Sequence, residues 1–568
     1  MSSSLVTQSA SATTPGRSGR SATRSALPLL LILLVGVAAP LVAVLIRAVT
    51  GYDGQPSALP ELAEPRNLRI LGNTVLLGVL VVFFSALMAA PLAFLMSWTR
   101  MRRHRWIDVV LMIPFMTPPY VAAIAWLDFV RINGLAEQLL GPLGVAVREG
   151  IESPVGMALV MASESFTFLY LILRTHLESI PASLDESASV SGASSWQRLR
   201  RILLPLSTPA FSVGALIIFI RAAGEFGTPV TMGNKIGFPV LVSEIYTAVT
   251  IYPLNFPTAA AFSSVLLTLG IIVWALQQWV SRNPLHFGGR VARRATVTLG
   301  PVRAAAGWVW LGLVALVSVV IPYISIILGS MTILRSKPLT LDNLTFEYFG
   351  IVLGSSSGMG AIQTSATLSF ISATIAVILG IACALVIARL RRRAMGRAID
   401  LLAVASDTVP AIVLAIGFIF FWNAPWWPIS PYNTAAMVVI GYIVILLPMV
   451  VQNIKTSRES IDDRLLEAAT ISGGTAWQTL RRVTLPLLVP GIVSGWLLAF
   501  LLGFREVVVS SLVRPASLNL ISPWILSHFD QGLRAEALAM TLVGVVGSTV
   551  VLVVVDTIRR RGAERRLA

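Results

Sequence analysis

Long runs of apolar residues, separated by short polar and basic segments, follow one another along the whole chain. Each run is close to or above the roughly 20 residues that a helix needs to cross a hydrocarbon core of about 30 Å. The twelve runs lie near residues 27–49, 70–98, 107–130, 154–173, 208–231, 258–280, 307–329, 362–388, 400–421, 433–453, 488–512 and 535–556. The pattern predicts an all-α, polytopic membrane protein with about 12 transmembrane helices.

Charged residues are scarce in this chain. Of the 568 residues, 55% are hydrophobic and 12% are charged, whereas a soluble domain carries roughly a quarter charged residues. The first 26 residues are rich in Ser, Thr, Ala and Arg, and the apolar run behind them is too long for a secretory signal. We therefore expect residues 1–26 to be a disordered tail that precedes the first membrane helix.

The net charge of +16 raises the question of nucleic-acid binding, and the placement of the basic residues answers it. With the twelve runs taken as spans, 31 of the 43 lysines and arginines fall on one side of the membrane and eight on the other. Such an asymmetry is the positive-inside rule, which puts the basic side and both termini in the cytoplasm. No nucleic-acid partner is expected.

Side chains that ligate metals are few and scattered. The one cysteine, Cys383, lies inside an apolar run, so neither a disulfide framework nor a thiolate cluster is expected. The four histidines, His104, His176, His286 and His528, lie far apart without metal-ligand spacing. The sequence therefore predicts no metal site and no cofactor bound by this chain.

Two segments of the chain are copies of one another. Residues 184–209 and 465–490 share ten identities, and every pair is 281 positions apart. The first copy contributes Glu186, Gly192, Trp196, Gln197, Leu199, Arg200, Arg201, Leu204, Pro205 and Pro209. Because six spans separate equivalent points, we expect two parallel six-helix repeats related by an axis along the membrane normal.

The repeat divides the chain into five parts. These are a tail (1–26), a first half (27–281), a linker (282–306), a second half (307–556) and a basic tail (557–568), with the linker and both tails in the cytoplasm.

The repeated segment is predicted to form two short helices on the cytoplasmic side. In the second copy, Leu465 to Ser472 is rich in helix formers, and Gly473 follows as a helix stop. A second short helix is expected over Ala476 to Val483, and Pro486 is expected to end it. Such a compact unit, anchored to the membrane helices, can transmit force.

This segment resembles the signature loop of the membrane subunits of bacterial ATP-binding-cassette importers. The signature is Glu-Ala-Ala, three residues, Gly, nine further residues, and then a hydrophobic residue, any residue and Leu-Pro. The second copy is intact, with Glu467, Ala468, Ala469, Gly473, Leu485 and Pro486. The first departs by one residue, with Glu186, Ser187, Ala188, Gly192, Leu204 and Pro205. The resemblance covers both halves, roughly residues 27–556.

The resemblance implies that each loop is a coupling helix seated on one of two ATPase subunits in the bacterial inner membrane. It also implies an extracytoplasmic substrate-binding protein as a further partner. The chain has only three lysines, Lys235, Lys337 and Lys455, and none lies in the Gly-Lys-Ser/Thr of a phosphate-binding loop. The chain is thus expected to be a transport subunit and not an enzyme, with ATP and Mg bound by the partner ATPase.

Among such importers, a fused chain of two halves most resembles the ferric-iron permeases, and the segment Gly224 to Gly227 resembles part of that type. Relatives that import thiamine, aminoethylphosphonate or polyamine remain alternatives. Glu225 and Glu506 are equivalent by the 281 offset and are candidate lining residues for a ferric pathway. Arg221 and Arg505 are nearby and either pair with these acids or serve an anionic cargo.

Two further expectations concern the spans. Asp128 and Arg131 have the helix spacing of an ion pair near the outer end of the third span. A twelve-helix secondary transporter, which also has parallel halves, is the alternative from another class. It would not need two helix-Gly-helix units on the cytoplasmic side.

Overall fold

The computed structural model describes residues 18–104, 106–281, 299–390 and 393–567. The regular elements described are helices, accompanied by two isolated β-bridges. The N-terminal helices are α1 (Ser18–Leu33), α2 (Ala39–Thr50), α3 (Pro65–Trp98), α4 (Trp106–Met116), α5 (Pro119–Phe129), α6 (Leu135–Leu140), α7 (Pro142–Ile151), α8 (Pro154–Ser179), α9 (Ala182–Val190), α10 (Ser195–Arg198), α11 (Leu204–Gly224), α12 (Leu241–Thr250) and α13 (Phe256–Val280).

The C-terminal part repeats this order of long and short helices. Its helices are α14 (Pro301–Ala315), α15 (Ile321–Met331), α16 (Glu347–Gly354), α17 (Ser356–Arg389), α18 (Ala394–Thr408), α19 (Ala411–Trp422), α20 (Ala435–Glu459), α21 (Asp463–Ile471), α22 (Ala476–Thr479), α23 (Leu485–Phe504), α24 (Val508–Val513), α25 (Ile521–Asp530) and α26 (Arg534–Leu567). Within the described residues, ten helices are long and apolar enough to cross a membrane, and two bent pairs raise this to as many as twelve.

Two of the predicted spans are not straight helices. The pair that covers 107–130 bends by 95° between α4 and α5, and the pair that covers 400–421 bends by 112° between α18 and α19. The bends occur at Pro118-Pro119 and at Val409-Pro410. Proline has no N–H and drives the preceding residue out of the helical region, so the helix stops at these positions.

The predicted span 208–231 is also too long at its C-terminal end, because α11 stops at Gly224. Glu225 has extended backbone angles (φ −70°, ψ 133°), and a π-helical turn follows over Pro229–Gly233. The equivalent helix α23 stops at Phe504, one residue before Arg505. Each half thus contains a second interrupted region in addition to its bent pair.

The predicted end of the second short helix of each repeated segment at a proline is wrong. The apolar helices run without interruption over Trp196–Gly224 and Ala476–Phe504, 29 residues each. One π-helical turn precedes each proline, and in these turns the N–H of Leu204 donates to Leu199 O and that of Leu485 to Leu480 O, five residues back. The wider turn leaves room for the proline ring, which would clash with the carbonyl four residues earlier in a regular helix.

The helical boundaries extend into the segments predicted as tails. Helix α1 begins at Ser18, and α26 continues to Leu567. The remaining N-terminal residues 1–17 and most of the predicted linker, residues 282–298, lie outside the described residues. The linker ends within α14, which begins at Pro301.

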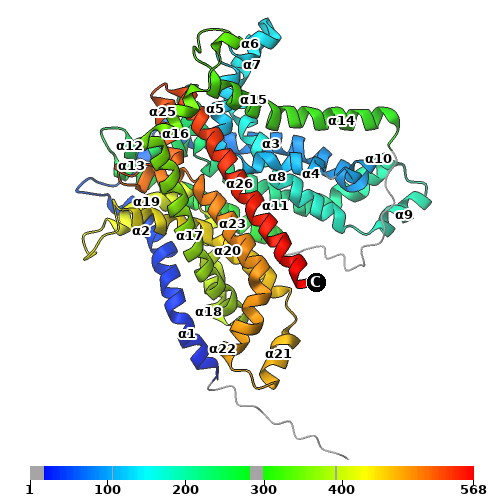
Figure 1. Cartoon of the computed structure of the whole chain (residues 1–568), viewed down its shortest axis with the longest axis vertical. Coiled ribbons are helices and arrows are strands. Elements are labelled where there is room, and N and C mark those ends of the chain that lie inside the picture. Colours follow the sequence, from blue (N-terminus) through cyan, green and yellow to red (C-terminus); the bar gives the residue numbers. More distant parts are fainter. Residues whose placement is uncertain (1–17, 105, 282–298, 391–392, 568) are drawn as a thin grey trace, which may run out of the picture.

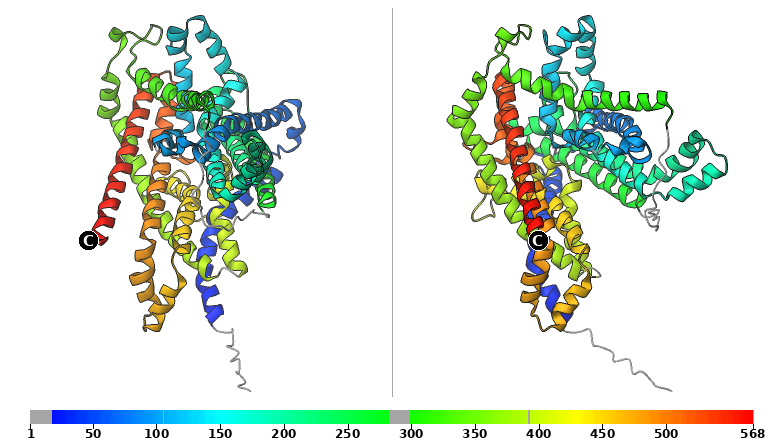
Figure 2. Two further views of the ribbon diagram at one scale, coloured as in Figure 1. Left: turned by 90° about the vertical axis from the view of Figure 1, so that its right-hand side faces the viewer. Right: turned by 45° about the vertical axis from the view of Figure 1, so that its right-hand side comes forward.

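The helices form two arms that diverge from a common end (Figure 1). Helices α3, α4, α8 and α11 run along one arm, and α17, α18, α20 and α23 run along the other. Helix α9 lies at the far end of the first arm, and α21 and α22 lie at the far end of the second (Figure 1). The two views of Figure 2 show the same divergence. The arms join around α5, α13 and α19, where one hydrophobic core extends through both halves.

The first helix of each half packs on the other half. Helices α1 and α2 contact α18 and α19, while α14 contacts α3 and α15 contacts α5. Gly417 of α19 lies so close to α2 that a Cβ there would be 2.6 Å from Pro40 O. The two halves therefore exchange their first helices, and this exchange holds them together.

Candidate functional site

The two repeated loops have the same backbone form at the ends of the two arms. In each loop a nine-residue helix, α9 or α21, is followed by a turn and a short second helix, α10 or α22. Gly192 and Gly473 both have φ of +80°, a left-handed conformation that glycine adopts without steric cost. The predicted helix-Gly-helix form is confirmed, and the two glycines are explained by it.

A reciprocal pair of hydrogen bonds starts the second helix of each loop. Gln197 N donates to Ser194 Oγ (3.2 Å) and Ser194 N donates to Gln197 Oε1 (2.8 Å). Thr475 and Gln478 form the same pair, at 3.3 and 2.9 Å. This is a capping box, which satisfies two amide donors that a helix N-terminus leaves free. It gives a structural reason for the glutamine found in both copies.

Both loops expose large apolar side chains at equivalent positions. The three pairs are Leu184 and Leu465, Val190 and Ile471, and Trp196 and Trp477. Val190 and Ile471 are 91% and 86% exposed, and the two tryptophans are 64% and 65% exposed. Exposed apolar clusters of this kind mark surfaces that another molecule covers. The loops are therefore the candidate docking sites, and we refer to these six residues as the docking patches.

The other residues predicted for the docking loops lie on or near the same surfaces. Ser187, Leu204, Pro205, Glu467, Ala468 and Pro486 are exposed, and Ala188, Ala469 and Leu485 are partly exposed. The side chain of Glu186 lies outside the described ones. None of the six residues of the docking patches was among the residues predicted for the docking loops. Their signal in the sequence is an apolar side chain at the same place in two otherwise polar segments.

The two candidate pathway acids bind backbone amides in the same way. Glu225 Oε1 accepts from Gly227 N at 2.6 Å, and its Oε2 accepts from Thr228 N at 3.0 Å. Glu506 Oε1 accepts from Val508 N (2.8 Å) and Val509 N, and Oε2 accepts from Ser510 N. Each carboxylate thus caps the short helix that follows the break in its half.

The two candidate arginines reach across to the opposite half. Arg221 Nη2 lies 3.5 Å from Asp407 Oδ1 at the end of α18, and its guanidinium lies 4.3 Å from the ring centre of Phe168. Arg505 Nη2 donates to Phe115 O near the end of α4 at 3.2 Å. Both contacts fall where a bent pair is interrupted. The arginines therefore hold the breaks of one half against those of the other.

A third acid, Glu164, belongs to this region and was missed from the sequence. It is in the middle of α8, is 9% exposed, and its Oε1 has no hydrogen-bond partner among the described residues. Glu225 and Arg505 both lie within electrostatic range of it. It is the one acidic or basic residue of the apolar run 154–173, and a buried charge in a span is a signal for function.

Close backbone packing completes the contact between the halves. A Cβ added to Gly224 would lie 2.7 Å from Pro410 Cβ of the second half, while one added to Gly227 would lie 2.6 Å from Tyr120 N of its own half. The hydroxyl of Tyr120 also donates to Ser522 Oγ of the second half at 3.1 Å. The interrupted segments thus meet in one layer, which we call the central layer. It lies where the two arms join.

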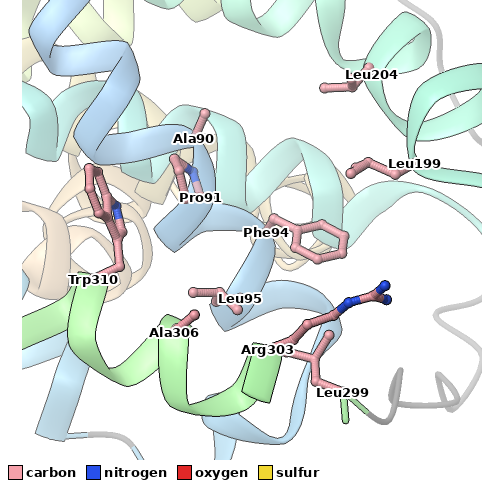
Figure 3. Close-up of a pocket in the computed structure, with 11 residues that line it drawn as sticks. Ala90, Pro91, Phe94, Leu95, Leu199, Leu204, Leu299, Arg303, Ala306 and Trp310 are labelled. Atoms are coloured by element: carbon pink, nitrogen blue, oxygen red, sulfur yellow. The ribbon is translucent and has the colours of Figure 1, made fainter. Parts of the chain in front are cut away.

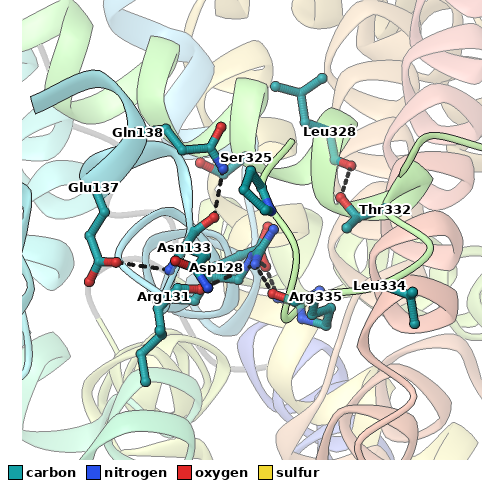
Figure 4. A network of polar contacts seen from close by, with 12 residues as sticks. Asp128, Arg131, Asn133, Glu137, Gln138, Ser325, Leu328, Thr332, Leu334 and Arg335 are labelled. Carbon is teal, nitrogen blue, oxygen red and sulfur yellow. Dashed lines mark hydrogen bonds and ion pairs between the residues drawn. The ribbon is translucent and has the colours of Figure 1, made fainter. Parts of the chain in front are cut away.

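A polar network ties the two halves together beyond the central layer (Figure 4). Arg131 Nε lies 3.6 Å from Asp128 Oδ1, which confirms the predicted ion pair, and the two side chains are 9% and 8% exposed. Arg335 of the second half also pairs with Asp128. Asn133 Nδ2 donates to Ser336 O at 2.9 Å. These contacts fasten the loop after α5 to the loop after α15.

Comparison with known proteins extends this description. The family described as "Binding-protein-dependent transport system inner membrane component" matches residues 81–285 and 376–565. The ferric transport system permease protein FbpB of Actinobacillus pleuropneumoniae is 23% identical over 546 residues, which cover 94% of this chain and 77% of that protein.

Two other relatives show the range of the family. The Fe(3+)-transport system permease protein FbpB 2 of Haemophilus influenzae is 24% identical, over 91% of this chain and 96% of that protein. The sulfate transport system permease protein CysT of Escherichia coli is 24% identical over 37% of this chain and 76% of its own length.

The matched segments cover more than half of the chain, and one of them lies in each half. Each contains one docking loop and one interrupted helix of the central layer. Members of this family are non-catalytic permease subunits, and ATP is bound by separate ATPase subunits. This chain, with its two repeated halves, belongs to the family of inner-membrane components of binding-protein-dependent transport systems.

Proposed function

We propose that this permease imports ferric iron through the central layer and that each of its two loops docks one ATPase subunit. In this proposal both termini are cytoplasmic, and a substrate-binding protein delivers the cargo from the opposite side. ATP-driven approach of the two ATPase subunits would pull the far ends of the arms together. Because the arms are joined at the central layer, this movement would open the layer toward the outside.

The observation that supports docking is the match between the two loops. They share the glycine turn, the capping box and the three apolar side chains of each docking patch. Two closely similar surfaces at the ends of two arms suit two copies of one partner. Burying an apolar side chain of this size contributes about 1.5–3 kcal/mol, so the patches can supply much of the affinity.

Variants of the docking patches test this part of the proposal. Val190→Asp with Ile471→Asp should abolish co-purification of the ATPase, and so should Glu186→Arg with Glu467→Arg. Leu341→Asp is the matched control, since Leu341 is 87% exposed but lies in a loop on the opposite side in the proposed topology. Unchanged recovery of the ATPase with both double variants would mean that the loops are not the docking sites.

Support for ferric iron comes from the relatives and from the acids of the central layer. The iron permeases match over most of both chains, and ferric iron is a hard cation that prefers oxygen ligands. Glu164 has a carboxylate oxygen without a hydrogen-bond partner among the described residues. Glu225 and Glu506 cap helices in the present state and would attract the ion as the layer opens. A site on a transport pathway must also release its ion, so ligands that contact the ion only briefly are appropriate there.

An anionic cargo would require positively charged instead of negatively charged groups along the pathway. A sulfate permease matches about a third of the chain, and Arg221 and Arg505 are the cationic groups that an oxyanion such as aminoethylphosphonate would use. Thiamine and polyamine are cations without the hard character of ferric iron. A secondary transporter is ruled out by membership of the family.

Uptake measured in proteoliposomes with the ATPase and the binding protein decides the cargo. Radiolabelled ferric iron should accumulate with the wild-type chain, and Glu225→Gln combined with Glu506→Gln should reduce it at least about tenfold, with ATPase recovery unchanged. Glu244→Gln, at an acid of helix α12 that pairs with Arg66, is the control. Normal iron uptake in the double variant would remove these acids from the pathway. Absence of iron uptake in the wild type, with thiamine, a phosphonate or polyamine carried instead, would exclude iron.

A further inference from the structure

A pocket of about 510 Å³ lies at the side of the first arm, close to its docking loop (Figure 3). Its walls come from three places in the sequence. Phe94 and Leu95 belong to the end of α3, Leu199 and Leu204 to the start of the helix that follows the docking loop, and Trp310 to α14. All but one of the side chains that line it are apolar.

The one charged lining residue is Arg303, at the start of α14 (Figure 3). It is exposed and has no ion pair described with any residue of the described ranges. Arg100, Arg102 and Arg103 follow the end of α3 and are exposed as well. Met101 between them holds this turn against α14, because its sulfur lies 3.5 Å from the position that a Cβ on Gly307 would take.

Acidic groups do not cancel this charge. The nearest acid in the sequence, Asp108, pairs with Arg174 of α8, and the pocket is lined by no Asp or Glu. Arg303 therefore gives the apolar pocket a positive charge, and the turn that carries the other three arginines packs beside Gly307 of its lining. We refer to these four arginines as the basic rim.

Aromatic side chains lie at the same level. Trp308 of α14 is 39% exposed, and its ring centre lies 5.3 Å from that of His104 and 6.3 Å from that of Trp106. Tryptophan is enriched where the hydrocarbon core of a bilayer meets the headgroups. Trp308 thus gives α14 an aromatic side chain typical of a membrane interface, next in sequence to Gly307 of the pocket lining.

We propose that this pocket binds one anionic phospholipid, with an acyl chain between α3, α11 and α14 and the phosphate among the four arginines. The apolar walls offer a hydrocarbon chain the same environment as the bilayer, while the basic rim adds the attraction for a negative headgroup. Basic pockets between membrane helices on the cytoplasmic side are a known form of lipid recognition. The basic residues place this rim on the side where the proposed topology has the cytoplasm.

The lipid would also support the docking loop. Leu199 and Leu204 flank the π-helical turn that joins α10 to α11, so a chain in the pocket braces the loop against α3 and α14. The lipid is therefore expected to raise the affinity for the ATPase at the first loop and not at the second.

Native mass spectrometry of the full chain, with dioleoylphosphatidylglycerol or dioleoylphosphatidylcholine added, tests the site. One phosphatidylglycerol should be retained per chain. Arg102→Gln with Arg303→Gln should weaken its retention roughly 30-fold, because each basic residue near an anionic lipid contributes about 1 kcal/mol. Ala306→Trp, which fills the pocket without changing its charge, should also remove the lipid. Arg397→Gln, an exposed arginine of the second half, should retain it.

Three results would overturn the proposal. The first is equal retention of the two lipids by the wild type, and the second is retention of phosphatidylglycerol by Ala306→Trp. The third is a loss of the lipid in Arg397→Gln as large as that in Arg102→Gln with Arg303→Gln, which would mean general attraction to a basic surface. A crosslink that places residues 282–298 in the pocket of the lipid-loaded chain would contradict it too. Ala306→Trp is also a test of binding that does not depend on transport or on the identity of the cargo.

Discussion

Single residues with unusual backbone or burial decide the form of both candidate sites. Gly192 and Gly473 have positive φ in the docking turns, and Glu225 and Glu506 cap helices at the breaks of the central layer. In the second pair the equivalence found in the sequence holds in three dimensions. Glu225 and Glu506 both accept hydrogen bonds from the backbone amides two and three residues ahead. The candidate pathway residues therefore also have a structural role.

We expect Gly473→Val to impair docking, because a β-branched residue in the left-handed region costs about 1–2 kcal/mol or more. No atom lies within 4 Å of a Cβ added at this position, so the effect would come from the backbone and not from a clash. Co-purification of the ATPase measures it. Gly473→Asn is the control, since Asn tolerates this conformation. Equal recovery with Val and Asn would show that the turn conformation is unimportant.

Asp128→Asn should lower the stability of the polar network that joins the loops after α5 and α15. Asp128 is 8% exposed and balances two arginines, Arg131 and Arg335. Removing one member of a buried ionic group typically costs about 3 kcal/mol or more, because the remaining charges lose their partner. Thermal unfolding in detergent should therefore show a lower midpoint. Asp342→Asn, at an exposed acid of the following loop, should leave the midpoint within error, and a similar drop there would contradict the prediction.

At the scale of helices, the exchange of the first helix between the halves is the main packing feature. Helix α2 lies against α19, and α15 lies against α5. Both partners are the second members of the bent pairs. The bends turn these short helices out of the direction of their spans, and the exchanged helices cover the surfaces that the bends create. The interruptions and the exchange are therefore parts of one arrangement.

Gly417→Ala tests the contact between α2 and α19. A Cβ at Gly417 would lie 2.6 Å from Pro40 O, which belongs to backbone and cannot rotate away, so α2 would have to shift. Overpacking of this kind usually costs about 1–3 kcal/mol. The melting midpoint should fall, and hydrogen exchange should increase in α2 and α19. Gly312→Ala is the control, because nothing lies within 4 Å of its Cβ position; no difference between the two variants would contradict close packing here.

The whole molecule has the form of two arms joined at the central layer, with the docking loops at the far ends (Figure 1). This form suits an importer whose energy comes from partners, because a movement at the loops is carried along helices of 29 residues to the layer. The π-helical turns are important here. They keep the second short helix of each docking loop and its membrane helix in one continuous rod instead of two pieces joined at a proline.

Orientation in the membrane is tested by cysteine labelling of the whole chain. The native Cys383 is buried, so single cysteines can be introduced with little background. A cysteine at Arg303, in the predicted linker, should react with an impermeant maleimide only from the cytoplasm, and one at Lys337 only from outside. The basis is the asymmetry of 31 to eight basic residues. Reversed accessibility at either position would overturn the proposed orientation.

The sequence by itself determined the number and approximate position of the membrane helices, the repeat and the form of the docking loops. These properties depend on local composition: an apolar run long enough to span, ten identities at one offset, and a glycine between two short helices. Lone charges in apolar runs are equally local, and Glu164 could have been found by this rule.

Only the tertiary structure decided how the helices are interrupted and joined. Pro118, Pro410 and Pro486 look alike in a sequence, yet two of them accompany bends and the third lies in a continuous helix behind a π-helical turn. The exchange of α2 and α15 and the pairing of Arg221 with Asp407 join residues that are more than 100 positions apart. Such contacts depend on which surfaces of distant helices fit together, and periodicity within one segment carries no information about that fit.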